Sequence, residues 1–198
     1  NNQEAFLNNI YNKKQFISLL CDYLKKDNQN VQICTGDADV LIVSVALKLA
    51  RNGCKSTVHA KDTDLIVLLL YHWNTPMEDI HFRSTKSNST WSIRECLKNI
   101  LPELHPHLLF MHAFTGCDTT SSIFEKGKQK IVKLMAKSLQ LQQCSLVFSD
   151  DNASQKEVGN AGAQAFILLY GSNPENTSLN KLRYVCMYCI LHGKCKVN

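Results

Sequence analysis

The sequence predicts an α/β fold with a parallel sheet and a helical C-terminal part. Short strand patterns alternate with helical patterns in the first half of the chain, which is typical of parallel strands joined by helices. The 198 residues are 44% hydrophobic and 20% charged, close to an average globular domain, which argues against a disordered chain. The longest apolar run, residues 65–71, is far shorter than the ~20 residues of a membrane span. We therefore expect a globular domain that does not cross a membrane.

The first half of the chain supplies the predicted sheet. Apolar residues at helical spacing, with suitable end signals, predict three helices, over residues 1–27, 40–49 and 65–73. The short extended segments that lie between or after them predict three strands, over residues 31–34, 56–60 and 80–83. These strands and helices alternate at short spacing, so we expect helices to connect neighbouring strands.

Helices dominate the second half of the chain. A polar loop is expected over residues 84–90, followed by three helices, over residues 92–101, 124–139 and 158–170. Apolar residues 108–114 lead into the turn Thr115-Gly116-Cys117-Asp118. We expect one domain over residues 1–170, which contains a basic helix-turn segment at 115–139, and a loop with a Cys-rich tail over 171–198.

The nine cysteines fall into two groups. Six occur singly among apolar residues, which predicts reduced thiols of an intracellular protein rather than a disulfide framework. The other three lie in the motif Cys186-x-x-Cys189-x-x-His192-x-x-Cys195. Its spacing is too compact to wrap one tetrahedral Zn²⁺ ion easily, so a zinc-binding interaction module is the weaker alternative. We interpret His105, His107 and His112 as surface or core residues, because no Cys or carboxylate accompanies them at ligand spacing.

Three short acidic motifs fall at the boundaries of predicted elements. They are Asp37-Ala38-Asp39, Asp62-Thr63-Asp64 and Gly116-Cys117-Asp118. Each follows a strand or an apolar segment, where an α/β sheet exposes its carboxyl edge and places its sites. A single motif of this kind is most simply a helix cap. Three of them in one chain favour convergence of the carboxylates at one sheet edge.

Converging carboxylates need a cation, because like charges at close range repel one another. Oxygen ligands without His or Cys suit Mg²⁺ or Mn²⁺ better than Zn²⁺. Two such ions about 4 Å apart form the usual clamp for hydrolysis of a phosphodiester. The acidic motifs therefore predict a metal site of hydrolytic type.

A basic segment follows the third acidic motif. Lys126, Lys130, Lys133 and Lys137 lie at the spacing of one helical stripe, after the turn Lys126-Gly127-Lys128. Backbone N–H groups at such a turn can hold a phosphate, so we expect this segment to bind a nucleic-acid backbone. A solvated amphipathic helix is the alternative. The net charge of +5, from 22 basic and 17 acidic residues, mildly favours a polyanionic partner.

The chain resembles the flap-endonuclease branch of the PIN-like nucleases, and more closely an uncharacterised animal group within it. The resemblance rests on GDADVLIVSVALKLA (36–50), AKDTDLIVLLLYH (60–72) and HAFTGCDTTSSIFEKGKQ (112–129), and covers roughly residues 15–170. It implies a twisted, mainly parallel sheet flanked by helices and a two-metal phosphodiesterase site for Mg²⁺ or Mn²⁺. The implied catalytic and metal-binding residues are Asp37, Asp39, Asp62, Asp64 and Asp118. The implied nucleic-acid-binding residues are Lys126, Gly127, Lys128, Lys130 and Lys133, with K⁺ at the 126–128 turn.

Two departures from the family pattern limit what the resemblance implies. Asp37 stands where the family usually has Glu, so this carboxylate reaches one methylene less far. The strand and helical arch that precede these motifs in the family, with their metal-binding Asp residues, have no counterpart here, so we expect an N-terminally incomplete nuclease domain. The sequence predicts an intracellular, nuclear rather than cytoplasmic, nuclease that acts on DNA or RNA. The alternative is a truncated, inactive relative that binds nucleic acid or another protein.

Overall fold

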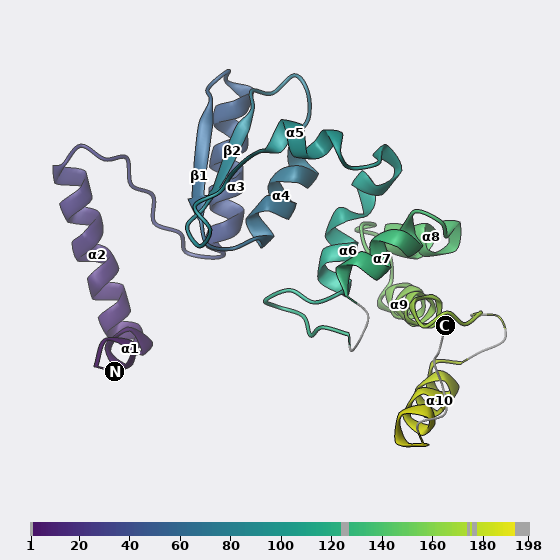
Figure 1. Cartoon of the computed structure of the whole chain (residues 1–198). Helices are drawn as coiled ribbons and strands as arrows, with labels where there is room; N and C mark the ends of the chain where they lie inside the picture. Colours follow the sequence, from purple (N-terminus) through teal and green to yellow (C-terminus); the bar gives the residue numbers. More distant parts are fainter. Residues whose placement is uncertain (1, 124–126, 174, 176–177, 193–198) are drawn as a thin grey trace. The chain divides into compact units, whose positions relative to one another are not determined.

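The computed structural model describes residues 2–123, 127–173, 175 and 178–192. The chain divides into two compact units, Asn1–Ile42 and Val43–Asn198, and the boundary falls inside helix α3 (Ala38–Arg51). The second unit holds the sheet, two hydrophobic cores and the acidic residues Asp62, Asp64 and Asp118. Figure 1 shows the succession of elements along the chain.

The first unit begins with helices α1 (Asn2–Asn8) and α2 (Ile10–Lys26). The chain breaks between them because the Asn9 side chain accepts hydrogen bonds from the backbone N–H groups of Tyr11 and Asn12, which caps α2. The strand predicted over residues 31–34 is wrong, since these residues are described and belong to no strand. A strand needs a neighbour to satisfy its backbone groups, and the alternating sequence alone does not supply one.

Among the described residues, the sheet of the second unit has three strands, in the order β1 (Ser56–Ala60), β2 (Ile80–Ser84) and β3 (Thr90–Ser92). Strands β1 and β2 are parallel, and β2 and β3 are antiparallel. The α/β class is therefore confirmed, and this sheet is mixed. The predicted loop over 84–90 is the connection of a hairpin, in which Asn88 adopts φ 55° and its side chain accepts two hydrogen bonds from the Arg83 guanidinium.

Helices α4 (Asp64–His72) and α5 (Ile93–Lys98) pack with α3 and the sheet around the first core. Phe82, Leu65, Leu69, Ile80 and Ile93 are fully buried there. Burial of such side chains stabilises a fold by about 1.5–3 kcal/mol each. The β1–α4–β2 crossover therefore holds the start of α4 at the carboxyl end of β1 (Figure 1).

A half-buried carboxylate, that of Asp79, fixes the start of α5. Asp79 accepts hydrogen bonds from the Ser92 hydroxyl at 2.6 Å and from the Arg94 backbone N–H at 3.0 Å. Burial acts to raise the pKa of Asp79, but these hydrogen bonds and the charges of His81 and Arg94 outweigh it, so the pKa lies below its usual value. Asp79 thus ties the hairpin to the helix that follows it.

The other elements that the structure describes in the second unit are helical. They are the 3₁₀ helix η1 (Pro102–His107) and the α-helices α6 (Leu108–Phe114), α7 (Lys128–Met135), α8 (Leu139–Val147), α9 (Gln155–Leu169) and α10 (Leu179–His192). The single helix predicted over 124–139 is wrong at its end, because the Ser138 hydroxyl accepts a hydrogen bond from the Leu141 N–H and starts α8. Ile131, Met135, Leu141 and Ala165 are fully buried in the second core.

The two cores meet along α4 and the segment that follows Pro102. The His105 ring lies 2.9 Å, through Nε2, from the Leu70 carbonyl oxygen and stacks on the Tyr71 ring. His107 is buried and bonds to the Ser145 hydroxyl, and its burial lowers its pKa. Both contacts agree with the interpretation of these two histidines as packing residues.

Within the predicted loop and Cys-rich tail, residues Leu179–His192 form helix α10. The side chains of Cys186, Cys189 and His192, and all of Cys195, lie outside the described residues, so zinc binding by the tail stays a prediction. Within the described part of the chain, no helix combines the length and apolar character needed to span a membrane.

Candidate metal centre

Asp62 and Asp64 lie in the connection from β1 to α4. One carboxylate oxygen of Asp62 accepts a hydrogen bond from the Asp64 backbone N–H at 3.0 Å, which closes a tight turn. Asp64 is the first residue of α4, where a negative charge is favourable next to the unpaired N–H groups. Leu65 and Leu69 of the same helix are buried and anchor α4 in the first core. The two carboxylates therefore sit at the carboxyl end of β1, as the sequence predicted.

The third carboxylate comes from the turn after α6. Thr115 is the C-cap residue of α6, and its buried hydroxyl donates to the Met111 carbonyl oxygen at 2.7 Å. Gly116 has φ +104°, and a Cβ atom there would lie 2.7 Å from the Ser122 Cα, so only glycine fits without strain. Cys117 and Thr120 then pair through two backbone hydrogen bonds of 3.2 Å. This turn places Asp118, whose side chain is exposed.

The structure brings together three of the five predicted acidic residues. Carboxylate oxygens of Asp62, Asp64 and Asp118 all lie within 4.8 Å of one another. They line an open groove of about 660 Å³, and Lys61, Lys86 and Lys128 line the same groove. An all-oxygen donor set of this size fits a hard cation such as Mg²⁺ or Mn²⁺.

The other two predicted residues, Asp37 and Asp39, belong to the first unit. An Asp37 carboxylate oxygen accepts a hydrogen bond from the Asp39 backbone N–H at 2.9 Å, in the same local arrangement as Asp62 and Asp64. This arrangement is also what a helix cap requires. Their membership of the metal site stays a prediction.

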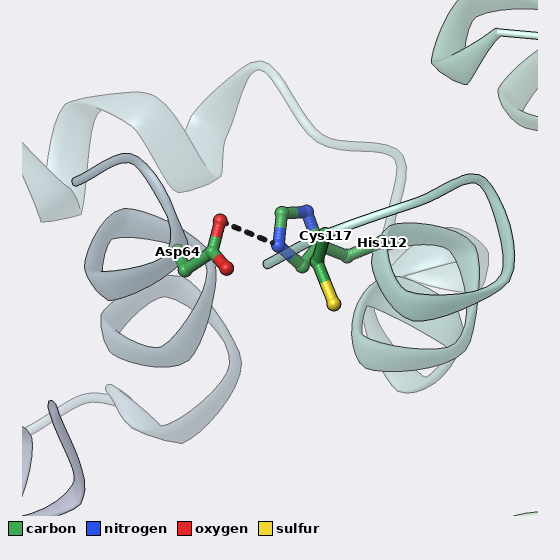
Figure 2. Close-up of side chains that lie close together, drawn as sticks. All are labelled: Asp64, His112 and Cys117. Carbon is green, nitrogen blue, oxygen red and sulfur yellow. Dashed lines mark ion pairs between the residues drawn. The ribbon is translucent and has the colours of Figure 1, made fainter. Parts of the chain in front are cut away.

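A histidine and a cysteine lie beside the carboxylates. The His112 Nε2 atom is 2.9 Å from a carboxylate oxygen of Asp64, and both side chains are largely buried, with exposed fractions of 13% and 23%. The Cys117 sulfur lies within 4.8 Å of one ligand atom of each. Figure 2 shows the Asp64 carboxylate pointing at the His112 ring, with Cys117 beside it.

His112 and Cys117 were not predicted as members of the site. Metal ligands are recognised in a sequence by local spacing, whereas Asp64 reaches His112 through the packing of α4 against α6. The feature of the sequence that could have indicated them is the segment HAFTGC, in which His112 lies near the end of one helix and Cys117 lies in the turn that follows.

Two hydroxyl groups hold the Cys117 sulfur. The hydroxyl oxygens of Thr119 and Thr120 each lie 3.3 Å from it. Hydrogen bonds from Thr119, then Thr120, lower the pKa of the Cys117 thiol below its usual value, because they favour the thiolate.

The basic segment lies next to the acidic turn. Lys128 donates a hydrogen bond from Nζ to the Gly116 carbonyl oxygen at 3.2 Å, which links α7 to the turn. Gly127, Lys128, Lys130 and Lys133 line a second hollow of about 490 Å³. Gly127 is the N-cap residue of α7, as the predicted phosphate-holding turn requires, and Lys126 lies outside the described residues.

Comparison of the chain with protein-family models, with curated proteins and with solved structures gave no match. The family resemblance drawn from the three motifs therefore stays a prediction.

Proposed function

We propose that the chain is a metal-dependent phosphodiesterase domain that acts on DNA or RNA. In this proposal it is related to the PIN-like nucleases of the flap-endonuclease type, and it works inside the cell, in the nucleus rather than in the cytoplasm. The observation that supports this best is the convergence of Asp62, Asp64 and Asp118 in a groove that three lysines also line. In this proposal the three described strands belong to a twisted, mainly parallel sheet of PIN type.

Asp62, Asp64 and Asp118 would hold one or two Mg²⁺ or Mn²⁺ ions. When bound, such ions activate water and neutralise the charge that develops on the leaving oxygen. The turn between Asp62 and Asp64 keeps both carboxylates in place before any cation arrives, which lowers the entropy lost on binding.

The lysines of the groove would bind the phosphates of the substrate. Lys61 precedes Asp62 directly, and Lys128 is held against the acidic turn through the Gly116 carbonyl oxygen. Lys130 and Lys133 extend this basic surface along α7, with Lys126 as a further candidate and K⁺ as a candidate ion at the 126–128 turn. Such contacts give affinity without reading base sequence.

The experiment is a cleavage assay on the full chain, with end-labelled single-stranded, duplex and flapped DNA and the matching RNA. Mg²⁺ or Mn²⁺ is added, and EDTA serves as the blank. We expect Asp62→Asn to reduce the rate at least about 100-fold, since misplacement of the reacting groups by 1 Å already has that effect. Asparagine keeps the oxygen that accepts the Asp64 N–H, so the turn survives and only the charge is lost.

Asp150→Asn is the matched control. An Asp150 carboxylate oxygen accepts a hydrogen bond from the Asn152 N–H at 2.9 Å, in the same local arrangement, but Asp150 belongs to neither group of converging ligands among the described residues. It should cleave like the parent chain. Binding of nucleic acid without any metal-dependent cleavage would instead favour the inactive relative, and equal loss of rate in both variants would contradict the proposed site.

A further inference from the structure

We infer that Asp64, His112 and Cys117 form a second type of cation site, which binds a borderline-soft divalent ion such as Zn²⁺ or Co²⁺ through one oxygen, one nitrogen and one sulfur atom. Their three ligand atoms lie within 4.8 Å of one another. Nitrogen and sulfur ligands favour such ions over Mg²⁺. The inference goes beyond the proposed nuclease activity, and it shares one ligand, Asp64, with the Mg²⁺ or Mn²⁺ site proposed above.

The separations suit a tetrahedral ion. Bonds of about 2.0–2.3 Å to such an ion place two N or O ligands about 3.3 Å apart, and sulfur about 3.6 Å from either of them. The Asp64 oxygen and His112 Nε2 are 2.9 Å apart, so they need to separate by only a few tenths of an ångström. Rotation of the Cys117 side chain, which lies on a turn, can supply the remaining approach.

A buried ring nitrogen of His112 lacks a hydrogen-bond partner among the described residues, and a bound ion would provide a partner for it. This nitrogen is Nε2, and the Asp64 oxygen is close to it. The carboxylate thus approaches at ion-pair distance without hydrogen-bonding geometry. A cation between the two atoms would use the nitrogen lone pair and the carboxylate charge together.

Cys117 is supported as a ligand by its surroundings. The Thr119 and Thr120 hydroxyl groups, 3.3 Å from the sulfur, orient it as outer hydrogen bonds commonly orient metal ligands (Figure 2 shows the sulfur without them). Asp64 and Cys117 also line the open groove, which leaves a fourth position for water or a substrate oxygen. Three protein ligands with one open position are typical of exchangeable and catalytic zinc sites.

In a structural alternative, His112 only contacts Asp64 and holds α6 against α4. It predicts no dependence of cation binding on Cys117. The two hypotheses therefore differ in whether the Cys117 sulfur binds the cation. A probe that reports sulfur ligation distinguishes them.

The test is a Co²⁺ titration of the full chain followed by absorption spectroscopy, because thiolate bound to Co²⁺ gives a charge-transfer band. Cys186, Cys189 and Cys195 are first changed to Ser, so that the tail contributes no thiolate. We expect one bound Co²⁺ per chain, with a thiolate band. Cys117→Ser should remove the band and lower the affinity at least about 100-fold, since loss of an outer-shell partner alone costs about 10- to 100-fold.

Cys54→Ser is the control, because Cys54 is exposed and belongs to neither ligand group among the described residues. It should keep both the band and the affinity. His112→Gln provides a second variant in case Cys117→Ser does not fold, and it should weaken binding while circular dichroism stays unchanged. Absence of a thiolate band in the parent, or a band that survives Cys117→Ser, would overturn the inference.

Discussion

Gly116→Ala tests whether the turn after α6 is built as described. The backbone of Gly116 has φ +104°, which side-chain-bearing residues rarely adopt and which costs about 1–3 kcal/mol. The added Cβ atom would also lie 2.7 Å from the Ser122 Cα and 2.9 Å from its N and Cβ, and overpacking of this kind costs about 1–3 kcal/mol. We therefore expect Gly116→Ala to lower the free energy of unfolding by about 2–6 kcal/mol.

The same substitution at two other glycines separates the two terms. Gly53 has φ +76° with no atom within 4 Å of the added Cβ, so Gly53→Ala carries the backbone term alone, about 1–2 kcal/mol. Gly159 lies inside α9 with open space around it, so Gly159→Ala should stabilise the chain by about 0.5–1 kcal/mol.

The assay is urea unfolding followed by circular dichroism, with midpoint and slope compared across the three variants. A midpoint for Gly116→Ala that is no lower than that of Gly53→Ala would refute the close approach of Ser122. A result for Gly159→Ala as damaging as either would show that the differences do not report these backbone positions.

Two further predictions follow. When Lys128, Lys130 and Lys133 are all changed to Ala, the slope of log affinity for duplex DNA against log salt concentration should become less negative by up to about 2.7, because each phosphate contact contributes about 0.9. The control Lys156→Ala should leave the slope unchanged. An unaltered slope in the triple variant would exclude α7 from the DNA interface. Burial lowers the pKa of His107 below its ordinary value of about 6.5, so the unfolded chain binds more protons than the folded chain as the pH falls through that value. The folded chain should therefore lose stability below pH 6.5. Urea midpoints measured between pH 7 and pH 5 should fall more steeply for the parent chain than for His107→Gln.

The sequence predicted those elements of the fold that depend on local pattern. The strand over 56–60 and the helix that follows it were found because the apolar residues of α4 and their Asp-rich start lie next to each other in the sequence. The strand over 31–34 was wrong because a strand is defined by its partner. Strand β3 was missed because it depends on a hairpin turn at Asn88 and on pairing of Trp91 with Phe82.

In the candidate site, too, the local turns could be predicted from the sequence, whereas the contacts made by tertiary packing could not. The pairing of Asp62 with Asp64 is a local turn and could be predicted, and the GCD turn marked Asp118. The contact of Asp64 with His112 joins residues 48 positions apart through packing of two helices, and no local spacing reveals it. Cys117 was read only as part of the turn that carries Asp118, although its sulfur faces the same cluster.

The most direct test of the central claim is Mn²⁺ binding measured by electron paramagnetic resonance, in which bound Mn²⁺ loses the sharp signal of the free ion. We expect at least one bound Mn²⁺ per chain, displaced by Mg²⁺. The Mn²⁺ affinity should fall at least about 10-fold in Asp62→Asn, Asp64→Asn and Asp118→Asn but not in Asp150→Asn. Asp118→Asn is the decisive variant, because only the folded turn brings that residue to the other two. An Mn²⁺ affinity that is the same in Asp118→Asn as in the parent chain would contradict a metal site formed by the three carboxylates.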